Sequence, residues 1–260
     1  MREGRMDAVR VQLDGISTSF RYPHFLVGRQ PTYRMPPPAT IYGHICSAVG
    51  EFVEPGGLRF AYHFTFKATA DDVEFLHIAS VGTGRPSRQW SYPENVTAQP
   101  NPVRRETLLF PSLVLYLAAP KRQLEMLYRA FREPRYAVAL GRSQDLAAYR
   151  RVDWITLQEA PSAYFEHTLL PLAYRERTTA GVTVVMPRYI NPHDREEVSW
   201  RMYLLLDRRV RLLPSSADEP PSASLMARQE PDEMVWIDPQ SPEDRGLYRA
   251  VVWHSFVDDE

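Results

Sequence analysis

A segment without acidic residues carries the side chains with the clearest chemical role in this sequence. Residues 15–50 contain no Asp or Glu, and the first half of the segment holds Arg21, Arg29 and Arg34. The guanidinium group of arginine pairs with phosphate through two hydrogen bonds and stacks on nucleobases. Because the second half has helical spacing, the arginines precede a helix N-terminus, whose free N–H groups also favour an anion. We interpret the segment as a phosphate-binding site and expect RNA as its ligand.

Prolines and apolar spacing divide the same segment into a loop and a helix. The range Arg21–Pro38 is rich in proline and ends in three consecutive prolines. Proline fixes φ and disfavours helix in the residue before it, so this range is expected to form an extended surface loop. Apolar residues then recur at i, i+4, i+7 and i+11, which predicts one buried helix face made of Ile41, Ile45, Ala48 and Phe52. Pro38 or Thr40 suits the start of that helix.

A second basic stretch, Gly82–Arg105, has no clear periodicity. It contains four prolines and two glycines, and long irregular segments inside compact domains are usually functional or disordered. Its arginines alternate with Trp90 and Tyr92, a combination that suits single-stranded nucleic acid because bases stack on the rings and phosphates pair with the cations. The alternative is a surface loop whose Trp90 packs into the core, and the sequence leaves both open.

The candidate RNA contacts come from these two basic stretches and from one further arginine. Arg142 follows Gly141 at the predicted end of a strand, where glycine lets the backbone approach a ligand closely. A helix-capping or salt-bridge role is the alternative for Arg142. The full set of candidates is Arg21, Tyr22, Arg29, Arg34, His44, Arg85, Arg88, Trp90, Arg104, Arg105 and Arg142.

The charge of the chain is nearly balanced but unevenly distributed. The formal net charge is -1, so the overall charge does not indicate a nucleic-acid-binding protein. The stretch Pro214–Glu260 is rich in Asp and Glu, and a polyanion would therefore meet the basic part of the chain.

We find no signal peptide and no run of about 18 apolar residues, which predicts a soluble cytoplasmic protein without a membrane partner.

Few residues in the sequence suggest catalysis. It contains no paired carboxylates, metal-ligand spacing, P-loop or nucleophile elbow, and a single cysteine, Cys46, excludes an internal disulfide and a multi-cysteine zinc site. His24 and His44 lie near the basic loop and could form the acid–base pair of a metal-independent ribonuclease. A surface or hydrogen-bonded structural histidine is the favoured interpretation for each. We therefore expect a non-catalytic protein without a metal or cofactor, with an endoribonuclease and a protein-only adaptor as alternatives.

The apolar patterns predict an α+β fold. Strands are expected within Met6–Ser19, over Leu58–Lys67, over Val73–Val81 as its continuation or hairpin partner, over Glu106–Ala118 with a bulge at Pro111, and over Tyr136–Leu140, with the second helix over Lys121–Glu133. This order is that of a ferredoxin-like unit, whose sheet leaves one face open, as in many RNA-binding modules. After Arg150 the runs are β-rich, which predicts one domain over residues 6–150 and a β-rich domain over residues 151–260.

Three motifs, in the order in which they follow along the chain, resemble the Cas-five family of CRISPR-associated proteins. This family is part of the RRM-like, repeat-associated superfamily. The three motifs are the Pro-rich segment Pro36–Gly43 that enters the first helix, Arg105-Glu106 with an apolar strand, and Leu140-Gly141-Arg142 after the second helix. The resemblance covers about Val9–Ala147, and the chain length together with the Tyr-Arg-Met-Pro-Pro-Pro sequence suggests subtype I-B or a relative. The C-terminal half resembles the family only in its β-rich character.

The resemblance implies a ferredoxin-like palm with a long inserted β-hairpin, the thumb, at about residues 82–105. It implies a subunit of a type I Cascade interference complex that caps the 5′ handle of the CRISPR guide RNA (crRNA). Its implied partners are the first backbone subunit, the large subunit and target DNA near the PAM. Relatives of subtype I-C cleave repeat RNA with a Tyr and an adjacent Lys-His pair, and this chain has no Lys-His dipeptide.

Overall fold

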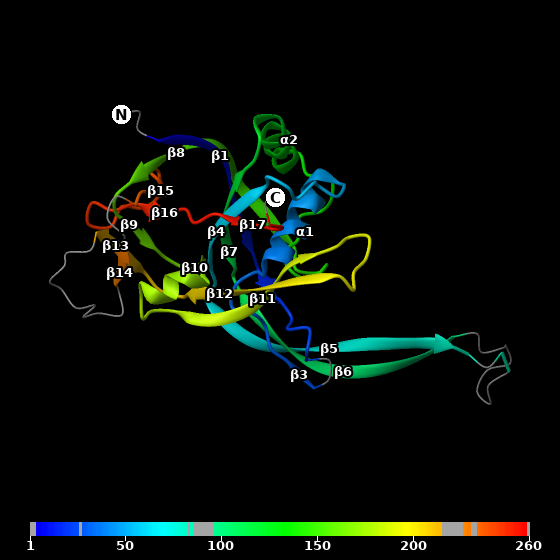
Figure 1. The fold of residues 1–260 in the computed structure, drawn as a ribbon. Helices are drawn as coiled ribbons and strands as arrows, with labels where there is room; N and C mark the ends of the chain where they lie inside the picture. The colour runs from blue at the N-terminus through cyan, green and yellow to red at the C-terminus, as the bar shows by residue number, and fades with distance from the viewer. Residues whose placement is uncertain are drawn as a thin grey trace.

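The computed structural model describes residues 4–25, 28–82, 84–85, 96–214, 226–229 and 233–258. Within these residues the fold is α+β and rich in strands, with two α-helices, α1 (Pro38–Val49) and α2 (Lys121–Arg132). Figure 1 shows a rounded body that contains both helices and a two-stranded ribbon that leads away from it. α1 begins at Pro38, one of the two predicted starts, and α2 spans nearly the predicted range.

A ten-stranded curled sheet forms the centre of the body. The order of its strands is β14 (Met226–Gln229), β13 (Val210–Pro214), β9 (Ala163–Phe165), β16 (Arg249–Ala250), β15 (Val235–Asp238), β8 (Ala147–Ala160), β1 (Arg5–Gly15), β7 (Ser112–Ala118), β4 (Arg59–Thr65) and β17 (His254–Ser255). The four strands β8-β1-β7-β4 are all antiparallel to their neighbours. The predicted domain boundary after Arg150 therefore falls inside β8, and the division into two domains stays a prediction.

Both faces of the central strands are covered. Side chains alternate along a strand, so Val9 and Val11 of β1 face the helices and pack in one core with Ile41 and Leu124. The other face packs in a second cluster, in which Ala8, Ala61 and Tyr116 meet Val251 from the C-terminal segment. The predicted open sheet face is thus wrong, because the C-terminal chain crosses that face on its way to β17.

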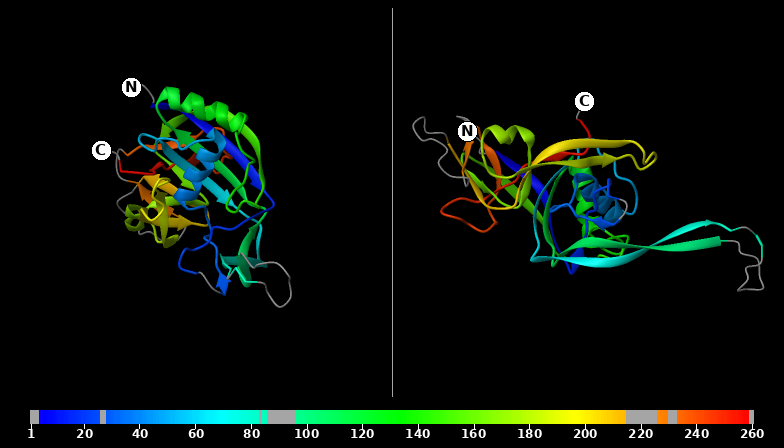
Figure 2. Two further views of the ribbon diagram at one scale, coloured as in Figure 1. Left: turned by 90° about the vertical axis from the view of Figure 1, so that its right-hand side faces the viewer. Right: turned by 90° about the horizontal axis from the view of Figure 1, so that it is seen from below.

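A long ribbon projects from the body. It consists of β5 (Ala68–Val81) and β6 (Val96–Leu109), which pair antiparallel along all 14 residues of each strand. Near its base, β6 also pairs with β2 (Ser17–Thr18) and β3 (Arg29–Gln30). Figure 1 and the right view of Figure 2 show that the rest of the ribbon extends away from the body.

The ribbon corrects three predictions. Part of the stretch predicted as irregular, residues 96–105, is strand, and β5 pairs with β6 rather than with β4. The predicted strand Glu106–Ala118 is two strands in different sheets, because the chain turns at Phe110, whose φ is 53°. Apolar residues resume directly after Pro111 and Ser112, so the residue pattern predicts a bulge there and does not reveal the change of sheet.

Two local predictions near the helices are also wrong. Gly50 ends α1 in the left-handed conformation with φ 95°, so Phe52 lies beyond the helix and is 61 % exposed instead of completing its buried face. Residues Tyr136–Leu140 form no strand, apart from a single bridge between Ala139 and Leu146. The first strand after α2 in the described chain is instead β8.

The C-terminal half is β-rich, as predicted. Besides the strands of the large sheet, it forms a three-stranded sheet of β10 (Thr168–Pro171), β12 (Val198–Leu206) and β11 (Val182–Ile190). The described helical structure in this half is the 3₁₀ turn Leu172–Glu176. The strands β11 and β12 run past α1, and their outer ends form one wall of the site described next.

Candidate nucleic-acid interface

Residues from five parts of the chain, among them the β11–β12 hairpin, line a cleft of about 440 Å³ on the body. Arg21 comes from the loop after β2, Arg105 from β6 and Arg142 from the turn after α2. The N-terminal end of α1, with Ala39 and Thr40, also reaches the cleft. Three of the predicted arginines and the predicted helix N-terminus are therefore brought together by the fold.

The N-terminal end of α1 is not neutralised by its own side chains. Pro37 occupies the N-cap position and makes no side-chain cap, and the first turn contains no acidic residue. The N–H groups of Thr40 and Ile41 both donate to the carbonyl of Pro37. These two N–H groups are therefore already engaged. Because Pro37, Ala39 and Thr40 line the cleft, the positive end of the helix dipole lies beside it, which favours an anion there.

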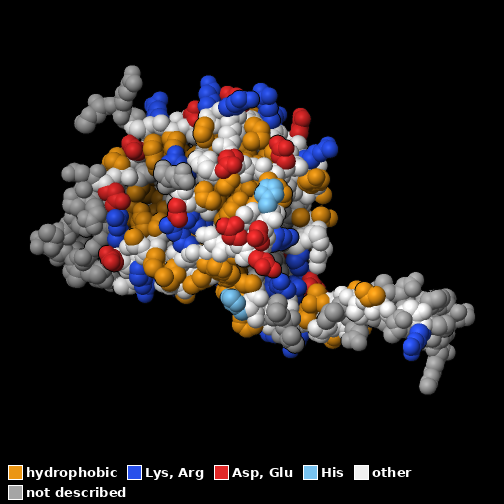
Figure 3. Space-filling model, turned by 45° about the vertical axis from the view of Figure 1, so that its right-hand side comes forward, with side chains coloured by type: hydrophobic (Ala, Val, Ile, Leu, Met, Phe, Trp, Pro, Cys, Tyr) orange, Lys and Arg blue, Asp and Glu red, His pale blue; other side chains and the backbone are white. Residues whose placement is uncertain are grey.

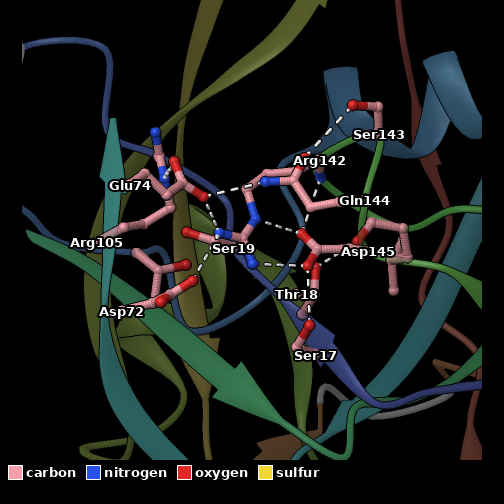
Figure 4. A network of polar contacts seen from close by, with 12 residues as sticks. Ser17, Thr18, Ser19, Asp72, Glu74, Arg105, Arg142, Ser143, Gln144 and Asp145 are labelled. Carbon is pink, nitrogen blue, oxygen red and sulfur yellow. Dashed lines mark hydrogen bonds and ion pairs between the residues drawn. The ribbon is translucent and has the colours of Figure 1, made fainter. Parts of the chain in front are cut away.

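Arg142 lies in a network of carboxylates at the edge of the cleft (Figure 4). Its Nε and Nη2 donate to Asp145 at 2.8 and 2.7 Å, and its Nη1 pairs with Glu74 of β5. These hydrogen bonds, with Asp145 as the strongest, raise the pKa of Arg142. The adjacent Gly141 has φ 100°, and a Cβ there would lie 2.6 Å from Thr18 Oγ1. The glycine therefore lets the backbone pack closely against Thr18 of the same chain. The ion pairs of Arg142 agree with the alternative interpretation, a salt-bridge arginine.

Arg105 shares the same carboxylate. Its Nε donates to Glu74 Oε2 at 2.6 Å, and its side chain is 8 % exposed. Glu74 therefore lies between two arginines, and it joins the ribbon to the turn after α2. Because both arginines are paired, the cleft is less positive than the sequence alone suggests.

The arginines at the base of the ribbon are paired as well. Arg29 donates to Asp71 at 3.1 Å and to Glu106 at 3.2 Å, and Arg104 lies 3.6 Å from Asp71. Glu106 also accepts the N–H of Thr32 at 3.0 Å. Figure 3 shows acidic and basic side chains next to each other where the ribbon leaves the body. This surface therefore combines both signs and is not a continuous basic patch.

The acidic partners were missed by the sequence interpretation, although the β5–β6 register contains the signal. In that register Asp72 stands opposite Arg105, and the observed partners, Glu74 for Arg105 and Asp71 for Arg104, lie two residues from the directly opposite position. Long side chains reach such diagonal neighbours, and opposite charges there attract each other. A hairpin predicted over residues 68–109 would have revealed these pairs, whereas an irregular loop over residues 82–105 did not.

The other candidates near the loop have mixed surroundings. Arg21 is exposed, and Arg34 lies over the Phe66 ring at 4.4 Å. Tyr22 stacks on Tyr33 at 3.7 Å between ring centroids, so one of its faces is already covered. Arg85 is exposed beyond the end of β5. Arg88 and Trp90 lie outside the described residues.

His44 is part of the core and not of the interface. It is 6 % exposed, its Nδ1 lies 2.9 Å from the carbonyl of Ala139, and Tyr149 Oη lies 2.9 Å from its Nε2. Burial lowers the pKa of His44 to about 4, so the ring is neutral at pH 7. The neutral ring with hydrogen on Nδ1 donates to Ala139 and accepts from Tyr149. The prediction of His44 as an RNA contact is corrected, because both ring nitrogens are engaged inside the protein.

His24 and Trp200 form a second aromatic feature beside the cleft. His24 is exposed, and its ring lies nearly parallel to Trp200, with 5.8 Å between centroids and 21° between planes. Trp200 lines the cleft from β12 and was not among the predicted contacts.

No group of three metal-ligating side chains occurs in the part of the chain that the structure describes. Neither described α-helix is long and apolar enough to cross a membrane.

Comparisons with known proteins give structural neighbours among CRISPR-associated proteins. The chain is similar to one described as "CRISPR RNA-guided surveillance complex", with 15 % identity over 85 % of this chain and 93 % of that chain and a TM-score of 0.45. It is also similar to "a CRISPR protein from Archaeoglobus fulgidus", with 10 % identity over 96 % and 100 % of the two chains and a TM-score of 0.44. A third neighbour is a "Cas protein", with 14 % identity over 77 % and 95 % and a TM-score of 0.38. No protein-family model matches the chain, and no curated protein matches its sequence.

Proposed function

We propose that the protein is a non-catalytic guide-RNA-binding subunit of a type I Cascade interference complex, in which it holds the 5′ handle of the crRNA. The observation that carries the proposal is the cleft, where Arg21, Arg105 and Arg142 meet at the uncapped end of α1. Guanidinium and helix N–H groups bind phosphate oxygens by position and charge alone. No catalytic group is needed for such binding.

The arrangement of strands supports the same proposal. The order β8-β1-β7-β4, with α1 after the first strand in sequence and α2 after the third, is the order that we assign to a ferredoxin-like unit. In this interpretation, the β5–β6 ribbon inserted between β4 and β7 is the thumb. A projecting ribbon with Arg104 at its base offers a surface along which a single strand of RNA can leave the cleft.

The proposal includes the assignment to the Cas-five family, near subtype I-B, and the partners that it implies. The ribbon would contact the first backbone subunit, and the body would contact the large subunit and target DNA near the PAM. The protein would act in the cytoplasm. Each of these contacts requires the assembled complex for its test.

A metal-independent endoribonuclease is the second candidate function, and one observation favours it. His24 is exposed and stacks on Trp200, which lines the cleft, so an imidazole lies near the proposed phosphate site. In-line cleavage by a 2′-hydroxyl needs both a general base and a general acid. Because His44 is buried and neutral, the second histidine of the predicted pair does not supply the other group.

The first experiment compares binding of a labelled repeat-derived 5′ handle with binding of a scrambled RNA of equal length, followed by a denaturing gel. Tighter binding of the intact handle supports the proposal, and a discrete cut that is lost in His24→Ala supports the endoribonuclease. We expect Arg21→Ala to weaken handle binding about tenfold, the value of one hydrogen bond to a charged group at about 1.5 kcal/mol. Arg122→Ala, which removes an exposed arginine of α2, is the matched control. Equal weak binding of both RNAs with no effect of Arg21→Ala would contradict the proposal.

A further inference from the structure

The cleft has two walls of different chemistry. One wall is apolar and comes from β11 and β12, where Pro187 and Trp200 are directly paired across the strands. The other wall carries Arg21 and Arg142. None of the described residues that line the cleft is Asp or Glu. A ligand that satisfies both walls therefore needs a flat apolar group and an anionic group.

Trp200 is exposed to an unusual degree for a side chain of its size. It is 40 % exposed, although large aromatic residues normally bury most of their surface. His24 lies nearly parallel to the ring with 5.8 Å between centroids but does not line the cleft, whereas Trp200 does. A nucleobase is a planar ring system that stacks on aromatic side chains in the same way.

The size of the cleft also limits its ligand. A volume of about 440 Å³ lies within the range of sites that hold one small molecule. A bare phosphate would leave the aromatic wall unused, and an apolar peptide would leave the arginines unused. In a duplex each base is covered by its neighbours, so only an unpaired nucleotide presents its face to a side chain.

We propose that the cleft holds one unpaired nucleotide of the bound RNA, with its base stacked on Trp200 and its phosphate at the wall of Arg21 and Arg142. This inference rests on the proposed RNA-binding function and adds to it a stacking residue from the C-terminal half. Because stacking tolerates any base, Trp200 fixes the position of the nucleotide in the cleft and adds affinity with little sequence preference.

The test uses the full chain and the labelled 5′ handle. One RNA is intact, and a series of RNAs has each nucleotide in turn replaced by an abasic ribose, which keeps the phosphate. A stacked base contributes about 1–3 kcal/mol, so Trp200→Ala should weaken binding of the intact RNA by roughly 5-fold to 150-fold. In the wild-type protein the abasic replacement at one position should weaken RNA binding by the same factor. In Trp200→Ala the same abasic replacement should cause no further loss of affinity. Trp200→Phe should retain most of the affinity.

Met202→Ala is the matched control, because Met202 lies two residues further along β12, is 51 % exposed and does not line the cleft. Thermal unfolding of each variant shows whether it is folded. The inference is overturned if the wild type binds the handle but Trp200→Ala binds as tightly as Met202→Ala, or if the abasic penalty is the same in both backgrounds. If the wild type does not prefer the handle to a scrambled RNA, the proposed function fails and the inference fails with it.

Discussion

Replacing Glu74 by Gln tests whether carboxylates of the ribbon compete with RNA for the cleft. Glu74 is 17 % exposed and pairs with both Arg105 and Arg142. Arg142 keeps Asp145 as a partner in the variant, whereas Arg105 has no other ion pair among the described residues. Glu74→Gln therefore raises the charge beside the cleft by one unit and leaves one arginine available to a phosphate.

The expected size of the effect follows from one additional phosphate contact. On single-stranded nucleic acid each contact contributes about −0.7 to the slope of log K against log salt, so the slope should become steeper by about 0.7. A unit charge near 4 Å contributes about 1 kcal/mol at the dielectric constant of water, which corresponds to roughly fivefold tighter binding at low salt. The free energy of unfolding should fall by about 1–2 kcal/mol, because hydrogen bonds between charged groups are weakened.

The assay is handle binding over a series of salt concentrations, together with urea unfolding. Glu125→Gln is the control, because it makes the same change in net charge on an exposed position of α2, at the opposite end of the body from the ribbon (Figure 1). The reasoning is refuted if Glu74→Gln has the same affinity and salt slope as Glu125→Gln. It is also refuted if the variant binds RNA more weakly than the wild type while its stability is unchanged.

Two further predictions concern stability. Arg10→Met should destabilise the fold by about 3–5 kcal/mol in urea unfolding. The reason is that Asp238, which is 1 % exposed, loses its Arg10 partner at 2.9 Å and stays buried. Adding Asp238→Asn should recover part of the lost stability, and no recovery would contradict this explanation. Stability should also fall as the pH drops from about 6.5 towards 4. Burial lowers the pKa of His44 and of His254 to about 4, so in this window the unfolded chain binds protons that the folded chain does not. The midpoint of thermal unfolding measured at pH 7 and pH 5 checks this, and His44→Gln should reduce the difference between the two values.

The elements with local signals were predictable from the sequence. Three consecutive prolines followed by apolar residues at helical spacing determine α1, and strict alternation determines β4. The end of α1 was missed because Phe52 continues the apolar spacing, while the left-handed conformation of Gly50 stops the helix. Local spacing thus indicates where an apolar face lies but not where the backbone leaves it.

Features that depend on long-range pairing were not predictable in the same way. The sheet face predicted to be open is covered by Val251, more than 200 residues from Ala8 in the chain, and no local pattern at either position indicates this contact. Of the candidate contacts, Arg21, Arg105 and Arg142 meet in one cleft, whereas His44 lies in the core. Residue type identified chemistry that suits RNA, but only the fold distinguishes a histidine near the cleft from one inside the protein.

The ion pairs around the cleft bear on how an RNA-binding function would operate. Arg29, Arg104, Arg105 and Arg142 are all paired with carboxylates in this structure. An entering phosphate must then replace a carboxylate, and the exchange of one anion for another gains little net Coulomb energy. Long-range attraction of any polyanion is correspondingly weak, in agreement with the net charge of -1. Under the proposed function, the affinity for RNA would depend on contacts that a carboxylate cannot make. A base stacked on Trp200 is a contact of this kind.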